Sequence, residues 1–121
     1  MTGEARAIAR VLLARHGEMC RPLGLTADAV TGDDVRHCAI FYENLCAAAG
    51  VPHLTRVVGR FLGEIADWCA AHSWPPLNSL AINKEAGMPG KGYDQAPNCS
   101  LLHRPEQVKN CIAFTGYPDH L

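Results

Sequence analysis

Residues 41–63 read Phe41-Tyr42-Glu43-Asn44-Leu45-Cys46-Ala47-Ala48-Ala49-Gly50-Val51-Pro52-His53-Leu54-Thr55-Arg56-Val57-Val58-Gly59-Arg60-Phe61-Leu62-Gly63. Leu45 and Ala48 fall on one face of a first helix. Gly50 stands where the C-terminus of a helix favours a left-handed residue. Pro52 stands near the start of a second helix, where its missing N–H costs least. The stretch therefore predicts two helices joined by a tight turn.

Helical spacing of apolar residues continues past the turn and predicts a second helix over 54–72. The residues that share this spacing are Leu54, Val57, Val58, Phe61, Leu62 and Ile65. Gly59 and Gly63 each cost such a helix roughly 1 kcal/mol against Ala, so we expect them to serve close packing. Arg56 and Arg60 lie one turn apart, on a face with His53. Helix, turn and helix is a unit of DNA-binding proteins, and this basic stripe is suited to phosphates.

Length and composition describe one domain, residues 1–121, large enough to build a core. Hydrophobic residues make up 48% of the chain and charged residues 19%, which excludes a disordered polyelectrolyte. The formal net charge of −1 argues against a strongly electrostatic nucleic-acid binder but leaves room for a locally basic face. No apolar run reaches the length of a membrane span, and the first residues lack the pattern of a signal peptide. We therefore expect a cytoplasmic protein.

The chain has six cysteines, and none of them forms a C-x-x-C pair. We expect them to be reduced, and those within helical patterns to act as small hydrophobic residues. Cys69 and His72, together with Cys99 and His103, would offer four zinc ligands. Their spacing is not one of the usual zinc patterns, so we expect neither a metal nor another cofactor.

The remaining signals predict an α+β domain of winged-helix character, with four helices and two or three strands. Whether one helix runs from 33 to 49 or two helices meet near residue 41 stays open. The other predicted elements are a helix over 4–19, a helical turn opened by Thr26, a helix cap at Thr31, a strand over 77–83, a Gly-rich loop over 88–93, a short helix within 100–103 and 105–110, and a strand over 111–114.

Residues 42–63, and more loosely the chain up to residue 93, resemble the helix-turn-helix segment of alkylguanine-DNA alkyltransferases and alkyltransferase-like proteins. The shared residues are Tyr42, Leu45, Gly50, Pro52 and the run Arg56-Val57-Val58-Gly59. The resemblance implies that Arg56 enters the minor groove and replaces a flipped nucleotide. It also implies that Tyr42 presses on the phosphate during the rotation. A guanidinium that fills the gap would offset part of the cost of base extrusion.

The nucleophile of that family is missing from this chain. A Pro-Cys-His-Arg motif carries the alkyl-accepting cysteine in the family, whereas the matching stretch here is Pro76-Leu77-Asn78-Ser79. No serine stands in a G-x-S-x-G elbow either. We therefore expect a protein that is not an enzyme.

Two functions from different classes follow from these patterns. The first is non-enzymatic DNA binding, and its predicted contacts are Tyr42, His53, Arg56, Arg60, Lys84 and Lys91, with Arg104 and Lys109 as further residues of a wing. The alternative is a small protein-binding module or inhibitor, encoded by a phage or mobile element, that acts on a host nucleic-acid-processing machine. Its interface would use Trp74, Met88, Tyr93 and Tyr117, because aromatic residues and Met are enriched at such surfaces. The oligomeric state stays open in both cases.

Overall fold

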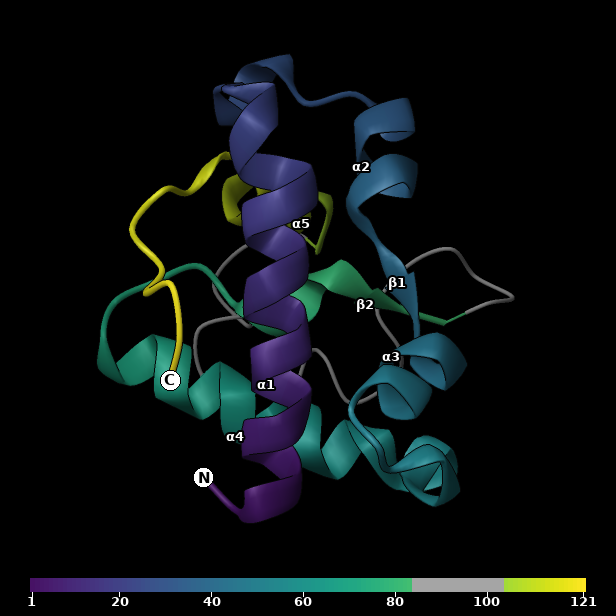
Figure 1. The fold of residues 1–121 in the computed structure, drawn as a ribbon. Helices are drawn as coiled ribbons and strands as arrows, with labels where there is room; N and C mark the ends of the chain where they lie inside the picture. The colour runs from purple at the N-terminus through teal and green to yellow at the C-terminus, as the bar shows by residue number, and fades with distance from the viewer. Residues whose placement is uncertain (84–103) are drawn as a thin grey trace.

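The computed structural model describes residues 1–83 and 104–121, and a long first helix, α1 (Gly3–Arg15), lies at its centre (Figure 1). Thr2 caps α1, because its hydroxyl accepts a hydrogen bond from the Ala5 N–H at 3.2 Å. One face of α1 is fully buried and carries Ala5, Ile8, Ala9 and Leu12. The chain then widens into a π-helical turn, η1 (His16–Cys20). The predicted helix over 4–19 is confirmed, except that its last turn is π-helical.

Two helices occupy the region where the sequence left a choice between one and two. After the short 3₁₀ turns η2 (Arg21–Leu23) and η3 (Ala27–Ala29), the helix α2 (Gly32–Cys38) begins at the predicted Thr31 cap. Thr31 and Asp34 form a capping box, which satisfies N–H groups on both residues. The chain is then extended through a two-residue strand, β1 (Ile40–Phe41), before α3 (Tyr42–Ala48).

The turn after α3 matches the sequence prediction, but the helix that follows begins later than predicted. Gly50 adopts φ 78°, the left-handed conformation expected of it. Residues Pro52–Val57 form a 3₁₀ helix, η4, and α4 begins only at Val58 and ends at Ala71. The Thr55 hydroxyl donates to the Pro52 carbonyl at 2.8 Å, which favours the tighter turn. The prediction of one regular α-helix from residue 54 is therefore wrong for its first four residues.

The described residues do not bear out the expectation that Gly59 and Gly63 serve close packing. Within 1–83 and 104–121, a Cβ atom added at either glycine would have nothing within 4 Å. Both glycines lie on α4, so packing among the described residues gives no reason for their cost in helix stability.

The segment after α4 is buried on all sides, which explains why its predicted strand is only partly correct. Ser73 adopts φ 59° and ends the helix before the two prolines. Residues 76–82 are all buried, Asn78 and Ser79 included, and they form the 3₁₀ helix η5 (Leu77–Leu80) and the strand β2 (Ala81–Ile82). The alternation that suggested a strand over 77–83 does not mark a half-exposed face here.

Strands β1 and β2 pair in parallel, with Ile40 opposite Ala81 and Phe41 opposite Ile82. The connection between them runs through α3, η4 and α4. The described residues thus show an α+β domain that is mostly helical with one small sheet. A wing would be an antiparallel hairpin, and its predicted lysines, Lys84 and Lys91, lie outside the described residues, as does the Gly-rich loop over 88–93.

The last helix, α5 (Arg104–Ala113), confirms the short helix expected within 105–110 and extends it. The prediction of a strand over 111–114 is wrong. Val108, Cys111 and Ile112 are buried at helical spacing on one face of α5, a pattern that the four consecutive apolar residues of 111–114 alone did not reveal.

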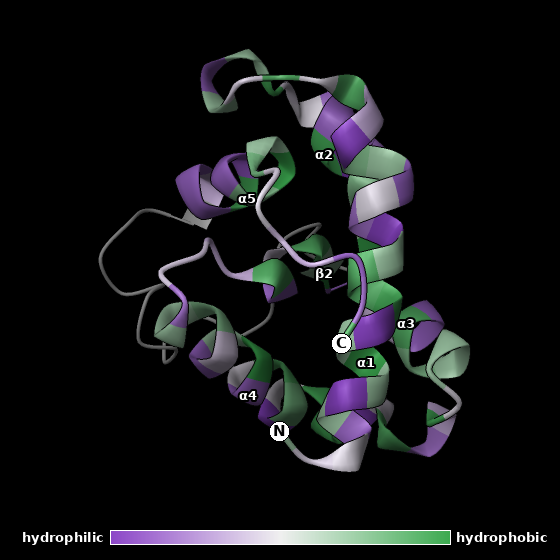
Figure 2. Cartoon of the chain, turned by 60° about the vertical axis from the view of Figure 1, so that its left-hand side comes forward, coloured by the Kyte–Doolittle hydropathy of each residue, from purple (hydrophilic) through white to green (hydrophobic). Residues whose placement is uncertain are grey.

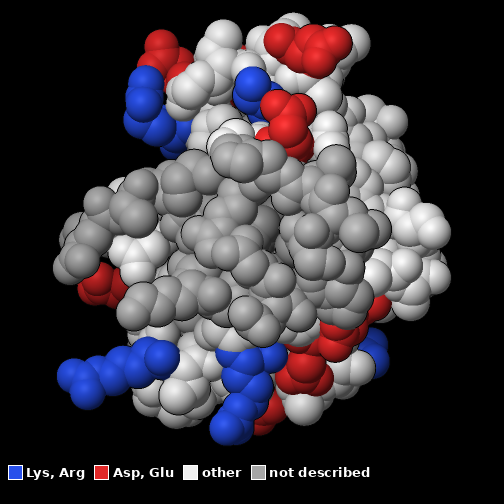
Figure 3. Space-filling view, turned by 180° about the vertical axis from the view of Figure 1, so that it is seen from behind, with Lys and Arg blue, Asp and Glu red and all other residues white. Residues whose placement is uncertain are grey.

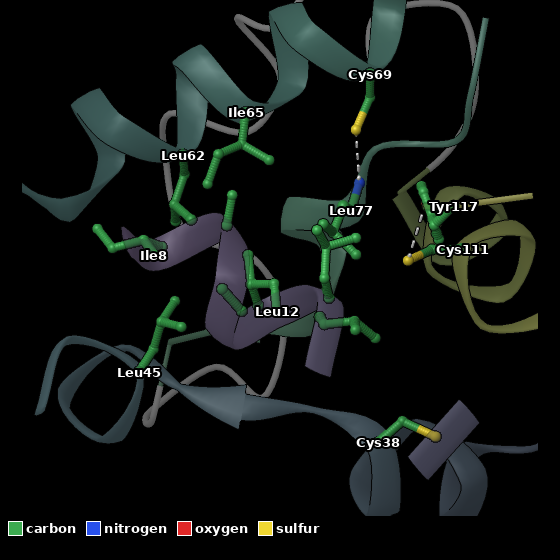
Figure 4. Close-up of a cluster of buried hydrophobic side chains, with 14 of the residues drawn as sticks. Ile8, Leu12, Cys38, Leu45, Leu62, Ile65, Cys69, Leu77, Cys111 and Tyr117 are labelled. Atoms are coloured by element: carbon green, nitrogen blue, oxygen red, sulfur yellow. Dashed lines mark hydrogen bonds between the residues drawn. The ribbon is translucent and has the colours of Figure 1, made fainter. Parts of the chain in front are cut away.

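The core lies between α1, α3, α4 and η5. Hydrophobic and hydrophilic residues alternate around α1 and α4 (Figure 2), as expected for helices with one buried face. Figure 4 shows Ile8 and Leu12 of α1 meeting side chains from α3, α4 and η5; those labelled are Leu45, Leu62, Ile65 and Leu77. No helix among the described residues is long and apolar enough to cross a bilayer.

Candidate nucleic-acid interface

One face of the unit formed by α3, the turn, η4 and α4 packs into the core. Leu45 and Cys46 of α3 are fully buried, and Val58, Leu62 and Ile65 of α4 are 0–6% exposed. Both helices contact α1 (Figure 1). Because the inner face is fixed in this way, the side chains on the outer face of η4 and of the first turn of α4 have a defined place on the surface.

Three of the predicted contact residues lie on that outer surface. His53 and Arg56 belong to η4 and Arg60 to the first turn of α4, and all three are exposed. Residues three apart in a 3₁₀ helix lie above one another, so His53 and Arg56 share one edge. Within 1–83 and 104–121, the ion pairs are Arg21–Asp119 and Arg36–Asp33, and neither involves these side chains. The structure therefore brings His53, Arg56 and Arg60 together as a basic edge.

The start of α4 lacks the features that usually stabilise a helix N-terminus. Its N-cap is Val57, which offers no side-chain hydrogen bond, and neither η4 nor α4 has an acidic residue in its first turn. Arg60 occupies the third helical position instead. A cation there opposes the helix dipole, whereas an anion would be favoured by both the dipole and the guanidinium.

An exposed apolar side chain stands within the basic edge. Val57 is 47% exposed, and among the described residues Met1 is the other large hydrophobic side chain that reaches such exposure. Val57 lies between Arg56 and the buried Val58 in the sequence. An apolar residue flanked by guanidinium groups can contact sugars and bases while the cations contact phosphates.

Carboxylates keep the surface around the basic edge from being uniformly positive. Figure 3 shows Lys and Arg side chains at the lower edge of the molecule, the end where η4 and the start of α4 lie in Figure 1, with Asp and Glu side chains beside them. The local charge is thus mixed, in keeping with the net charge of −1. Any anion that binds here must meet particular side chains rather than a broad positive field.

The other predicted contacts do not join this edge in the described residues. Tyr42 is half-buried, packs against the core and begins α3, so about 10 Å of helix separates it from the turn before η4. Lys84 and Lys91 lie outside the described residues, and so does the side chain of Arg104. Lys109 lies on α5, whose main contacts among the described elements are with η5, η3, α2 and η1.

An aromatic surface of Trp68, His72 and Trp74 lies at the C-terminal end of α4, and of these residues only Trp74 was predicted from the sequence as part of an interface. Trp68 and Trp74 are half-buried, with ring centroids 5.1 Å apart, and His72 stacks on Trp74 at 4.3 Å. The left-handed Ser73 makes this arrangement possible, and no sequence signal marked that residue. Tyr117, predicted as an interface residue, is buried, and its hydroxyl donates to the Pro75 carbonyl. Met88 and Tyr93 lie outside the described residues.

Two of the four possible zinc ligands, Cys69 and His72, lie in the described residues, and they do not form a common site. The Cys69 sulfur is buried and accepts the Leu77 N–H at 3.4 Å, whereas the exposed His72 bonds through Nδ1 to the Trp68 carbonyl at 2.9 Å. No group of three His, Cys, Asp or Glu residues within 1–83 and 104–121 could hold a metal ion. Cys99 and His103 are not among the described residues.

Comparisons with known proteins leave the basic edge as the main guide to function. No family model, curated protein or solved structure matches this chain. The resemblance of residues 42–63 to the alkyltransferase helix-turn-helix segment thus stays a prediction from those residues, and the proposal that follows depends on the geometry around η4.

Proposed function

We propose that this chain is a non-enzymatic DNA-binding protein that docks through η4 and the first turn of α4. One observation carries the proposal: an exposed arginine, Arg60, occupies the third position of a helix whose start has neither a side-chain cap nor an acid. The protein gains nothing in stability from this arrangement, because a cation there opposes the dipole. A bound phosphate would turn the same arrangement into a favourable one.

The neighbouring residues extend the contact from one phosphate to a short stretch of backbone. Arg56 supplies a second guanidinium, and His53 stands one 3₁₀ turn before it. Val57 places an apolar group between them and the helix, where a groove presents sugars and base edges. Insertion of Arg56 in place of a flipped nucleotide, with Tyr42 in support and a wing beyond residue 83, is the finer form of this proposal.

Gly59 gives the proposal a backbone component. It lies between the two arginine-bearing turns and is exposed, and a Cβ atom added there would have no neighbour within 4 Å. A glycine that packing within the described part of the chain does not require can serve the close approach of a ligand to the backbone. Gly63, one turn further along α4, has equally open surroundings and provides the matched comparison.

Fluorescence anisotropy on labelled duplex and single-stranded oligonucleotides tests the proposal. The wild-type chain is compared with the double variant Arg56→Ala/Arg60→Ala over a range of salt concentrations. The control is Arg36→Ala, which removes the same kind of charge from α2, at the opposite end of the molecule (Figure 1). We expect the double variant to bind roughly 10- to 100-fold more weakly. On duplex DNA we expect its log–log salt slope to be shallower by about 1.8, or 0.9 for each phosphate that is no longer neutralised.

Three results would contradict the proposal. These are an unchanged affinity and salt slope in the double variant, an equal loss in Arg36→Ala, and the absence of binding by the wild-type chain at low salt. Thermal unfolding of each variant shows whether a loss of binding reflects a loss of fold.

The alternative, a protein-binding module, is favoured by the aromatic surface of Trp68, His72 and Trp74. These side chains lie at the C-terminal end of α4, far from the basic edge. A partner that docks there would leave Arg56 and Arg60 free, so substitutions at the two ends of α4 separate the two functions. Loss of partner binding in Trp68→Ala, with no effect of the arginine variants, would favour the module.

A further inference from the structure

Buried cysteines gather around the junction of η1, α2 and α5. Cys20, Cys38, Cys69 and Cys111 are free thiols and at most 1% exposed. Two of these sulfurs are held by other groups: Cys69 accepts the Leu77 N–H at 3.4 Å, and Cys111 accepts the Tyr117 hydroxyl at 3.5 Å (Figure 4). The remaining two, on Cys20 and Cys38, interact with each other.

Several contacts hold Cys20 and Cys38 together. The Cys20 thiol donates a hydrogen bond to the Cys38 sulfur, and the Cys38 thiol donates at 3.4 Å to the carbonyl oxygen of Met19, the residue before Cys20. Arg15 fixes the end of α2 from the other side, because its guanidinium donates to the Cys38 and Ala39 carbonyls, each at 2.7 Å. Two thiols in hydrogen-bond contact on clamped segments are close to the arrangement that a disulfide requires.

We propose that Cys20 and Cys38 form an oxidation site, at which a hydroperoxide closes a disulfide between η1 and α2. Cys38 loses its proton, its thiolate attacks one peroxide oxygen and the O–O bond breaks, so that Cys38 becomes a sulfenic acid while the hydroxide or alkoxide that leaves takes up that proton and departs as water or an alcohol. The Cys20 sulfur then attacks the Cys38 sulfur, the S–S bond forms, and the sulfenic oxygen leaves as water with the Cys20 proton. The two sulfurs together lose two electrons, which the peroxide gains.

The surroundings assign the first step to Cys38. The hydrogen bond from Cys20 lowers the pKa of Cys38, and the same bond, together with burial, raises the pKa of Cys20. Cys38 is therefore the better nucleophile and Cys20 the resolving thiol. By contrast, burial raises the pKa of Cys111 to about 12, which keeps that thiol protonated.

The cross-link would tie α2 to the end of the long central helix. Residues 20 and 38 enclose the two 3₁₀ turns η2 and η3 and most of α2, a segment otherwise held by few buried side chains. Closing that loop restricts the unfolded chain, so the oxidised protein is expected to unfold at a higher temperature, by roughly 5 °C or more. This inference does not depend on the proposed DNA binding.

Peroxide oxidation followed by mass spectrometry tests the site. The Cys46→Ala variant is used, because trypsin then leaves Cys20 in peptide 16–36 and Cys38 as the single cysteine of peptide 37–56. The folded, reduced protein is treated with hydrogen peroxide, alkylated after denaturation and digested. We expect a disulfide between these two peptides and the loss of alkylation at both cysteines. In Cys20→Ala, dimedone should capture Cys38 as the sulfenic acid.

The inference is overturned if no Cys20–Cys38 cross-link forms in the folded protein at a peroxide concentration that oxidises the urea-unfolded chain. It is equally overturned if the main cross-link joins another pair, Cys99 included. The wild-type chain, in which peptide 37–56 is resolved further by chymotrypsin, gives the same test without any substitution. Wild-type data therefore decide the outcome even if a cysteine variant fails to fold.

Discussion

The first turns of α2 and α4 are built in opposite ways. Helix α2 begins with Thr31 as its cap and Asp34 at its third position, and the two residues form a capping box. Helix α4 begins with Val57 as its cap and Arg60 at its third position, with no side-chain hydrogen bond. The same backbone position thus carries the charge that a helix dipole favours in one helix and the charge that it disfavours in the other.

The acid at the third position of α2 stabilises the fold, whereas the cation at the third position of α4 does not. The N–H groups and the dipole at the first turn of α2 are satisfied by the protein's own capping box. The N-terminus of α4 continues directly from η4. The hydrogen bonds of η4 satisfy backbone groups there, since the Val58 N–H donates to the Thr55 carbonyl, but they supply no negative charge. Under the proposed function, a bound phosphate would supply the negative charge that the start of α4 lacks.

The largest effect on DNA affinity is expected when the two arginines at the N-terminal end of α4 are removed. Arg56→Ala/Arg60→Ala should lower DNA affinity roughly 10- to 100-fold and leave the unfolding temperature within a few degrees of wild type, because both side chains are exposed. Anisotropy and thermal unfolding on the same samples measure the two quantities. A large drop in stability would show that the arginines serve the fold after all.

The capping box of α2 should matter for stability alone. Thr31→Ala removes the hydroxyl that accepts the Asp34 N–H at 3.2 Å, and the expected loss in the free energy of unfolding is about 1 kcal/mol. Chemical denaturation measures it, and DNA affinity should stay as in the wild-type chain. The contrast between the two helix ends fails if this variant loses affinity as strongly as the arginine variants.

Two glycine variants sharpen the contrast along α4. Gly59→Ala and Gly63→Ala should each raise the free energy of unfolding by up to about 1 kcal/mol, since both positions have open space for a methyl group. Only Gly59→Ala should also weaken DNA binding, because only Gly59 lies within the basic edge. Equal affinities for the two variants would remove the backbone of residue 59 from the interface.

Reversing the charge at the third position of α4 should stabilise the protein while it impairs function. Arg60→Glu gives α4 the acid that α2 already has, and the expected gain is about 0.3–1 kcal/mol at low salt. The same variant should lose most of its DNA affinity, since it places an anion against phosphates. Urea denaturation at low and high salt checks the gain, which should shrink as salt screens the dipole.

The smallest effect concerns acid. Hydrogen bonds from the Thr31 backbone and side chain lower the pKa of Asp34 below its usual 3.8. A lowered pKa in the folded state means that the capping box stabilises α2 fully above pH 3.8 and loses its effect as pH falls through the lowered value. A pH titration of unfolding should therefore show a shallower acid loss in Asp34→Asn than in the wild-type chain. Identical pH profiles for the two proteins would show that the Thr31–Asp34 capping box does not stabilise the folded chain.

Local chemistry made part of this fold predictable from the sequence. The caps at Thr31 and Gly50, the two prolines after α4 and the apolar face of α1 all act through neighbouring residues, so their patterns are visible in the chain. The placement of His53, Arg56 and Arg60 was predictable because helical spacing and 3₁₀ spacing both leave them on one surface.

Other features depended on contacts between distant segments and could not be predicted. The complete burial of Asn78 and Ser79 and the parallel pairing of Ile40 with Ala81 arise from packing across the core. Tyr117 was assigned to a surface because its type is common at interfaces, whereas its hydroxyl bonds within the core. The Cys20–Cys38 pair likewise joins residues that no spacing rule connects.

The most direct test of DNA docking through η4 and the start of α4 is an NMR titration of the isotope-labelled chain with a short DNA duplex, which locates the contact residue by residue. We expect the largest shifts in backbone amide signals to fall on residues 53–60, while the signals of α2 stay in place. Shifts centred on Trp68 and Trp74, or no shifts at low salt, would contradict the proposed interface.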